Sequence, residues 1–164
     1  MRLRRSPLMI ALLATMALAG CHSKTATPVA ATPATVNVQH LNGSTEVKKH
    51  PQRIVVLDYA SLETLQLLGV EPLALPGNRK NLPDSLKRYQ DDKYLNAGTL
   101  FKPDMAVLRA AKPDLILIAG RASKAYDELN ALAPTLNMSV DPQDQLGSLK
   151  QRTLQLGELD RKST

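Results

Sequence analysis

Two short runs of consecutive apolar residues constrain the fold of this chain more than any other feature of its sequence. They lie at 54–57 and within 114–119, and each is followed by a segment in which leucines recur at helical spacing. A strand that is apolar at every position has to be covered on both faces, which is typical of parallel sheets flanked by helices. We therefore predict an α/β fold, a three-layer sandwich with a mostly parallel sheet.

The other elements follow from residue spacing and turn residues. Asn42-Gly43 is the strongest short signal for a β-hairpin, Gly69 is placed to end a helix, and Asp104 to cap another. We expect hairpin strands at 36–41 and 44–48, further strands at 54–57, 72–75, 114–119 and 135–140, and helical segments before Gly69, at 83–89, from Asp104 to Ala111, over Tyr126, Leu129 and Leu132, and at 143–159.

The amino terminus has the three-part pattern of an export signal. Three arginines within the first five residues precede an apolar run at 8–18, which is too short to span a bilayer, and then small residues. Leu18-Ala19-Gly20-Cys21 resembles the lipobox of bacterial lipoproteins, in which the cysteine is lipidated. We predict a lipoprotein signal peptide at 1–20, a lipidated, palmitate-bearing Cys21, a flexible tether at 21–35 and a folded lobe at 36–164.

The scarcity of cysteine and histidine limits the chemistry of the folded part. Cys21 is the only cysteine, so we expect no disulfide and no cysteine-based site there. His22, His40 and His50 lack the spacing of metal ligands, so we predict no metal site built by the protein. Without residues 1–20, which hold three arginines and no acids, the formal charge falls from +6 to +3. With no basic run and one phenylalanine, no nucleic-acid binding is expected.

Candidate ligand-binding residues are those that follow the predicted strands. Ligands of open α/β sheets bind beyond the carboxyl ends of the strands, and these positions hold Asp58-Tyr59, Asn78-Arg79-Lys80, Gly98 to Lys102 and Gly120-Arg121. Three of the four edges carry cations, which favours an anionic ligand. Arg121 is the best placed, because it follows the clearest strand and precedes a predicted helix amino terminus. The residues selected for ligand binding are Arg121, Lys102, Lys80 and Tyr59.

Some of these side chains also have an ordinary structural explanation. Arg79, Lys80 and Lys124 could be solvated loop cations. Tyr59 could be a half-buried loop residue instead of a ligand-facing aromatic. The sequence alone leaves both alternatives open.

An enzyme is less well supported than a binding protein. The chain has no glycine-rich phosphate loop, no Gly-x-Ser-x-Gly elbow and no histidine near a candidate nucleophile. We assign no catalytic residue. Ser61 and Ser123 are interpreted as helix-start residues whose hydroxyls accept backbone N–H groups.

Several short segments occur in the order found in a known family. They are 51–58 (PQRIVVLD), 61–65 (SLETL) with 68–70 (LGV), 81–83 (NLP), 96–98 (NAG) and 112–121 (KPDLILIAGR). With them, residues 48–157 resemble the amino-terminal lobe of the iron-siderophore and vitamin B12 periplasmic-binding proteins, the capture subunits of ABC importers. The Asn-Leu-Pro and Gly-Arg segments are most similar to the branch that takes ferric catecholate-type siderophores, which are anionic.

The resemblance implies how such a chain would bind. The siderophore wraps the iron, so the protein supplies cations and hydrogen bonds and needs no cofactor, and Arg121 matches the arginine that contacts the ligand. Two positions depart from the family pattern. Relatives often carry Lys where Phe101 stands, with the cation moved here to Lys102, and they carry a permease-docking Glu where Ala106 stands. Family members have two lobes, and we expect the amino-terminal lobe alone, truncated before the second at Thr164.

We therefore expect a monomeric, lipid-anchored substrate-binding lipoprotein of an ABC-type iron-siderophore import system. It would lie in the cell envelope, facing the periplasm or the outer face of the membrane. Its partners would be a ferric siderophore, an ABC permease and the membrane, and no enzyme activity is expected. The alternative is an envelope lipoprotein lobe that interacts with another protein, or is inactive through truncation, and binds no small ligand of its own.

Overall fold

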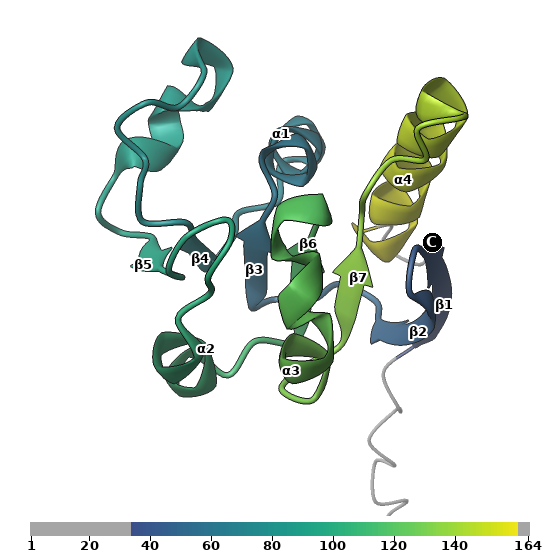
Figure 1. Cartoon of the computed structure of the whole chain (residues 1–164), viewed down its shortest axis with the longest axis horizontal. Coiled ribbons are helices and arrows are strands. Elements are labelled where there is room, and N and C mark those ends of the chain that lie inside the picture. Colours follow the sequence, from purple (N-terminus) through teal and green to yellow (C-terminus); the bar gives the residue numbers. More distant parts are fainter. Residues whose placement is uncertain (1–33, 161–164) are drawn as a thin grey trace, which may run out of the picture. The chain divides into compact units, whose positions relative to one another are not determined.

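The computed structural model describes residues 34–160, and a five-stranded parallel sheet lies at their centre (Figure 1). All of its pairings are parallel, and the two central strands, β3 and β6, pair over their whole length. Every residue of these two strands is buried, which explains why both are apolar throughout. The strand order is β5 (Leu95–Asn96), β4 (Ala74–Leu75), β3 (Ile54–Leu57), β6 (Leu115–Ile118) and β7 (Thr135–Asn137).

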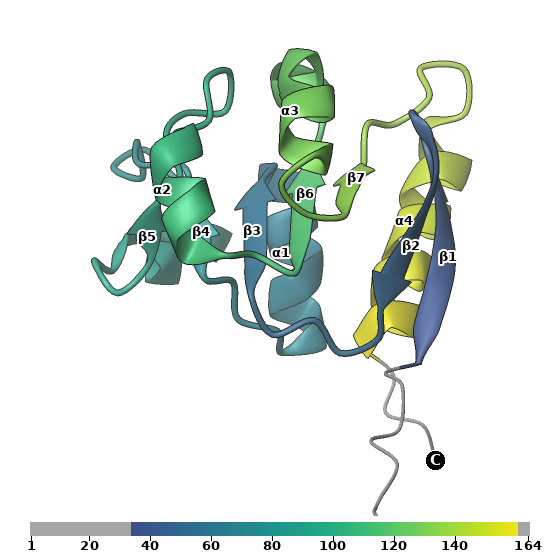
Figure 2. The same cartoon turned by 90° about the horizontal axis from the view of Figure 1, so that it is seen from below.

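Helices cover both faces of the sheet, which confirms the predicted three-layer α/β fold. The helices are α1 (Tyr59–Leu68), α2 (Met105–Ala111), α3 (Tyr126–Asn130) and α4 (Gln145–Asp160). Figure 2 shows α2 and α3 on one face, with α1 on the other. Each face has its own apolar cluster, one shared with α1 and α4 and the other with α2 and α3. The sheet is therefore held from both sides, and its strand ends are fixed in position.

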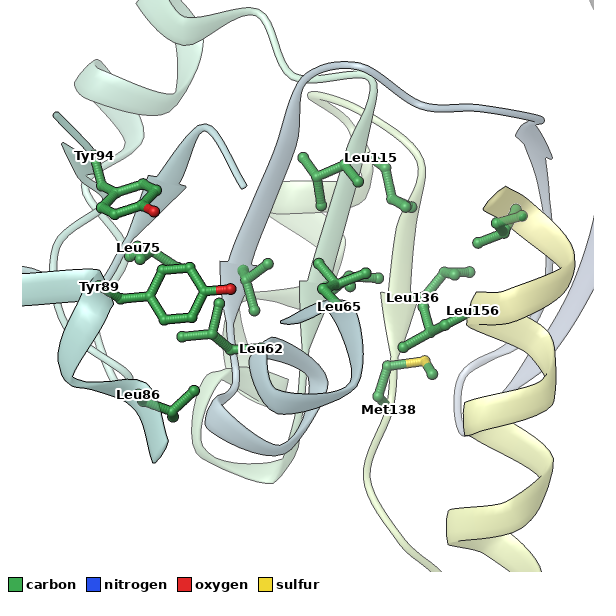
Figure 3. Packing of buried hydrophobic residues seen from close by; sticks show 14 of the residues in the cluster. Leu62, Leu65, Leu75, Leu86, Tyr89, Tyr94, Leu115, Leu136, Met138 and Leu156 are labelled. Carbon is green, nitrogen blue, oxygen red and sulfur yellow. The ribbon is translucent and has the colours of Figure 1, made fainter. Parts of the chain in front are cut away.

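The larger apolar cluster lies under α1, α4 and the 3₁₀ helix η1 (Asp84–Gln90). Figure 3 shows Leu62 and Leu65 of α1 in the middle of this cluster, between the side chains of η1 and those of α4. Packing is mostly aliphatic, and two tyrosines fill the η1 end, with the ring centroids of Tyr89 and Tyr94 5.3 Å apart. This cluster fixes the start of α1, where the candidate residue Tyr59 lies.

A β-hairpin precedes the sheet, as predicted, but its turn lies one residue earlier. β1 (Thr35–His40) pairs with β2 (Gly43–Lys48) so that His40 faces Gly43, and Leu41 and Asn42 form the turn. Gly43 has a φ of 120°, so glycine is needed within the strand instead of in the turn. The hairpin contacts β7 through Asn137, whose side-chain amide donates to the Asn42 side chain at 2.6 Å.

Short side-chain caps set the helix boundaries. Asp58 caps α1, because its carboxylate accepts from the Ser61 N–H at 2.8 Å, and α1 ends at Gly69 in the left-handed conformation. Asp104 caps α2 as predicted. The interpretation of Ser61 and Ser123 as cap acceptors is wrong, since both hydroxyls donate: Ser61 to Asp58, and Ser123 to the backbone carbonyl three residues earlier.

The structure differs from the predicted elements mainly at the edges of the sheet. The sequence does not predict β5, because both of its residues are exposed and show no apolar pattern. β4 has two residues instead of four, and β7 ends at Asn137 instead of 140. The side-chain oxygen of Asn137 accepts from the N–H and the hydroxyl of Ser139, which turns the chain away from the sheet. The segments at 83–89 and after β6 form the 3₁₀ helices η1 and η2 (Gly120–Ala125).

Several predictions fall on residues that the structure does not describe. The signal peptide (1–20), the lipidated Cys21 and almost all of the tether (21–35) lie outside the described residues and stay predictions. The first strand begins at Thr35, close to the predicted start of the lobe. Between residues 34 and 160, no helix combines the length and the apolar character needed to cross a membrane.

Candidate functional site

The strand order creates a topological switch point between β3 and β6. From β3 the chain proceeds outward to β4 and β5, and from β6 it proceeds outward to β7 on the other side. The segments that follow β3 and β6 leave on opposite faces, α1 on one and α3 on the other (Figure 2). Ligands of open α/β sheets bind at such a point, beyond the carboxyl ends of the strands. Tyr59 and Arg121 are the selected residues that follow these two strands.

Tyr59 links the ends of β3 and β4. Its side chain is half-buried, and its hydroxyl donates a long hydrogen bond to the Asn78 backbone oxygen at 3.4 Å. Burial raises the pKa of Tyr59 above its usual 10.0, and the positive charges of Arg121 and Arg79 act in the opposite direction. The hydroxyl is therefore neutral at physiological pH and lies within electrostatic reach of both guanidinium groups. We call Tyr59, Arg79 and Arg121 the switch-point cluster.

Arg79 is a largely buried cation in this cluster. Its side chain is 11% exposed and lies 3.9 Å from the fully exposed Asp92 carboxylate. Nη2 donates a long hydrogen bond to the Asp91 backbone oxygen at 3.5 Å. Nε and Nη1 are buried and have no hydrogen-bond partner among the described residues. A desolvated cation with unused donors is costly, and the one ion pair of Arg79 within residues 34–160, to Asp92, is long and exposed on the Asp92 side.

Lys80 shares an open hollow of about 320 Å³ with Arg79, walled by Gly77, Gln90 and Asp92. The Lys80 side chain is exposed. The Gln90 side-chain amide donates to the backbone oxygens of both Arg79 and Lys80 at 3.1 Å, which holds this loop in place. Lys80 is the residue selected from this loop on the sequence, whereas the geometry favours its neighbour Arg79. Nothing in the order of the residues says which of two adjacent cations is buried.

Arg121 lies inside η2, instead of before an α-helix as predicted. It is exposed and forms no ion pair with any residue between 34 and 160. Side chains three residues apart lie on the same side of a 3₁₀ helix, so Lys124 continues the cationic edge that Arg121 begins. Arg121 is thus available to a ligand through its charge, without the expected help of a following helix dipole.

Lys102 lies on a tight turn after β5. The Thr99 N–H donates to the Lys102 backbone oxygen, and the Lys102 N–H donates to the Thr99 hydroxyl, both at 2.9 Å. Gly98 has a φ of 89°, and a Cβ there would lie 2.5 Å from backbone atoms of Lys102 and Asp104. The turn backbone is therefore fixed and requires glycine, although the Lys102 side chain itself is exposed.

The structure groups Lys102 with Lys124 and Phe101 instead of with the switch-point cluster. These three residues line an open hollow of about 690 Å³, between the turn after β5 and the end of η2. We call it the Phe101 hollow. From the sequence alone, Lys124 could be a solvated loop cation. Its position beside Phe101 is found only in the structure, where η2 places it on the opposite wall of the hollow.

The side chains of the described residues are not arranged to bind a metal ion. Between residues 34 and 160, no group of three or more His, Cys, Asp or Glu side chains could hold a metal ion. His40 has structural contacts: its Nδ1 accepts from the Asn137 N–H at 3.4 Å, and its Nε2 lies 2.8 Å from the Thr45 hydroxyl. Burial lowers the pKa of His40, which favours its neutral form.

Comparison with known proteins identifies the family to which this fold and site belong. Residues 54–161 match the family described as periplasmic binding protein. The chain is 35% identical to the petrobactin-binding protein YclQ of Bacillus subtilis over 125 residues, 76% of this chain and 39% of YclQ. It is 38% identical over 117 residues to the putative ABC transporter substrate-binding lipoprotein YhfQ of the same organism, 66% of this chain and 36% of YhfQ.

A solved structure agrees with these matches. The periplasmic catecholate-siderophore binding protein VctP from Vibrio cholerae superposes with a TM-score of 0.72 and 39% identity, covering 77% of this chain and 46% of VctP. The chain thus spans less than half the length of each of these three relatives. The matched region contains the whole parallel sheet and its carboxyl edge, so the predicted fold class and the predicted family are both confirmed. This chain belongs to the periplasmic binding protein family.

Proposed function

We propose that this chain captures an anionic ferric siderophore at the carboxyl edge of its sheet, as the substrate-binding component of an ABC-type iron import system. The observation that carries the proposal is Arg79, a mostly buried guanidinium whose Nε and Nη1 have no partner among the described residues. Arg79 follows β4, and its positive charge acts on Tyr59 together with that of Arg121. The similarity to YclQ, which binds petrobactin, and to VctP, which binds a catecholate siderophore, supports a ligand of this class.

The chemistry of the edge suits an iron chelate better than free iron. The siderophore encloses the metal, so the protein needs donors and positive charge and no resident cofactor. Guanidinium groups form charge-assisted hydrogen bonds with the chelate oxygens, and these are stronger than neutral ones. Tyr59 adds a neutral hydroxyl within electrostatic reach of Arg79 and Arg121. Lys80, Lys102 and Lys124 attract the anion from a distance, and this attraction weakens as salt screens it.

In the cell envelope, a lipid on Cys21 would hold the lobe at the membrane, where an ABC permease receives the ligand. The similarity to the lipoprotein YhfQ supports this location. Each buried methylene of an acyl chain contributes about 0.8 kcal/mol to membrane affinity, so several chains anchor a protein stably. We expect a monomer that binds and releases its ligand unchanged, without enzyme activity and without nucleic acid as a partner.

Titration of the purified full chain, kept in mild detergent, with a ferric tris-catecholate siderophore tests the proposal. The sequence has four tyrosines and no tryptophan, so quenching of tyrosine fluorescence reports binding. Hydrogen bonds to charged groups contribute about 1.5–3 kcal/mol, so Arg121→Ala should weaken binding about 10-fold or more. Arg88→Ala, at a half-exposed arginine of η1 that is paired with Glu71, is the control and should bind normally.

Two results would count against this function. A folded chain that binds no ferric siderophore at micromolar concentrations contradicts the capture of such ligands. Normal binding by Arg121→Ala removes that arginine from the site and leaves Arg79 and Tyr59 to be tested.

A further inference from the structure

The Phe101 hollow has features that general capture of an anion does not explain. Phe101 is the only phenylalanine of the sequence, and it is 73% exposed. It lies on the turn after β5, at the carboxyl edge of the sheet, and the opposite wall of the hollow is formed by Lys124, Ala125 and Glu128. An aromatic ring left in water at this edge presents apolar surface that a bound ligand could cover.

The charges in the hollow favour a negatively charged ligand. Each of its two acids has a partner that offsets part of its charge, since Asp104 caps α2 and Glu128 lies 3.9 Å from the Arg109 guanidinium. Lys102 and Lys124 form no ion pair within residues 34–160. The groups left available are one aromatic ring and two ammonium groups. This set complements an aromatic ring that carries anionic oxygens.

The position of Phe101 is set by its turn. The Phe101 N–H donates to the Thr99 hydroxyl at 3.3 Å, and Gly98 and Pro103 close the turn as a β-bridge. Lys124, which lines the hollow, lies on the same side of η2 as Arg121. A ligand held at Arg121 could therefore extend toward Phe101.

We propose that Phe101 selects siderophores that carry aryl rings. Its ring packs against a catecholate or phenolate ring of the chelator, in an offset or edge-to-face arrangement, while Lys102 and Lys124 neutralise the ring oxygens. Citrate and hydroxamate chelators have no ring to offer and gain nothing from this contact. The inference rests on the proposed capture of ferric siderophores and assigns a specificity residue to it.

The single phenylalanine allows a direct test. When 4-fluorophenylalanine is incorporated in place of Phe101, the full chain gives one protein ¹⁹F signal. Gallium(III) replaces iron(III) at the same charge without paramagnetic broadening, so the chain is titrated with gallium complexes of a tris-catecholate siderophore and of citrate. Tyrosine fluorescence reports binding in the same samples. We expect the ¹⁹F signal to shift with the catecholate complex, and to stay in place with citrate even where fluorescence shows that citrate is bound.

Phe101→Leu supplies the second measurement, because it keeps an apolar side chain and removes the ring. Aromatic pairs are worth about 0.5–1.5 kcal/mol beyond their buried area, so affinity for the catecholate complex should fall about 2- to 10-fold while that for citrate stays the same. Leu67→Ala, at an exposed leucine of α1, is the control and should change neither affinity.

The outcomes separate this inference from the proposed function. Catecholate binding without a ¹⁹F shift, together with an unchanged ratio of affinities in Phe101→Leu, overturns the role of Phe101 and leaves siderophore capture intact. The absence of binding to any complex overturns both.

Discussion

Arg79 and Lys102 follow neighbouring strands, yet the protein positions these two cations in different ways. The Arg79 side chain is 11% exposed and contacts Asp91 and Asp92, whereas the Lys102 side chain is exposed on a turn whose backbone alone is fixed. A buried, ordered group loses little further hydration or rotamer freedom when a ligand arrives, while an exposed lysine loses both. We expect Arg79 to contribute short-range affinity, and Lys102 to contribute attraction that depends on salt.

The largest expected effect concerns the backbone of the Lys102 turn. Gly98→Ala should lower the free energy of unfolding by about 3 kcal/mol, because the added methyl meets backbone atoms at 2.5 Å in addition to the strain of a positive φ. Chemical denaturation followed by circular dichroism measures the change. A loss of this size would show that the exposed lysine rests on a rigid turn.

Gly69→Ala is the matched control for this substitution. Gly69 also has a positive φ, 73°, but a Cβ there meets nothing within 4 Å. Its replacement should cost only about 1 kcal/mol, the strain of a left-handed alanine. Equal losses at both positions would mean that the turn yields easily, and the proposed contrast between fixed backbone and fixed side chain would then fail.

The next effect tests the buried cation. Arg79→Met keeps much of the apolar volume and removes a charge whose Nε and Nη1 have no partner among the described residues. Affinity for a ferric catecholate should fall about 30-fold, since a charge-assisted contact of about 2 kcal/mol is lost. The free energy of unfolding should rise by about 1 kcal/mol, because a desolvated charge is replaced by an apolar side chain.

Opposite changes in affinity and stability distinguish a ligand-binding arginine from a structural one. Titration and chemical denaturation of the same protein samples measure both quantities. Arg88→Met is the control, because Arg88 is half-exposed and already paired with Glu71. It should change stability slightly and affinity not at all. A marked loss of stability in Arg79→Met would instead show that Arg79 supports the loop around Asp91.

The sequence predicts the centre of the sheet well, because burial on both faces requires an apolar residue at every position. Ile54–Leu57 and Leu115–Ile118 satisfy that requirement and become the paired strands β3 and β6. The edges are harder to predict, since the two residues of β5 are exposed and are held in the sheet by backbone hydrogen bonds alone. The end of β7 depends on the Asn137 side chain, which accepts hydrogen bonds from Ser139, and no residue pattern in the sequence predicts these bonds.

The candidate site also has a part that the sequence predicts and a part that only the structure reveals. The ends of the predicted strands locate the carboxyl edge, so the sequence alone is enough to select Tyr59 and Arg121. The choice between Arg79 and Lys80 depends instead on η1 and the segment after it, where Gln90, Asp91 and Asp92 lie against this loop. Such a tertiary contact, between segments with no shared periodicity, is not encoded in local residue spacing.

The smallest expected effect belongs to the exposed cations. The double variant Lys102→Ala, Lys124→Ala should bind a ferric catecholate about 3-fold more weakly at low ionic strength, because exposed ion pairs contribute about 0.2–1 kcal/mol. At about 1 M salt the Debye length is about 3 Å, and the difference from the unmodified chain should vanish. The loss caused by Arg79→Met should persist there, because its guanidinium is shielded from ions. Lys48→Ala, Lys49→Ala makes the same change in net charge at the end of β2, on the side of the sheet where β3 begins, and should leave affinity unchanged at either salt concentration. A salt-independent loss of affinity in the Lys102 and Lys124 variant would mean that these lysines are as well shielded from solvent as Arg79 when the ligand binds.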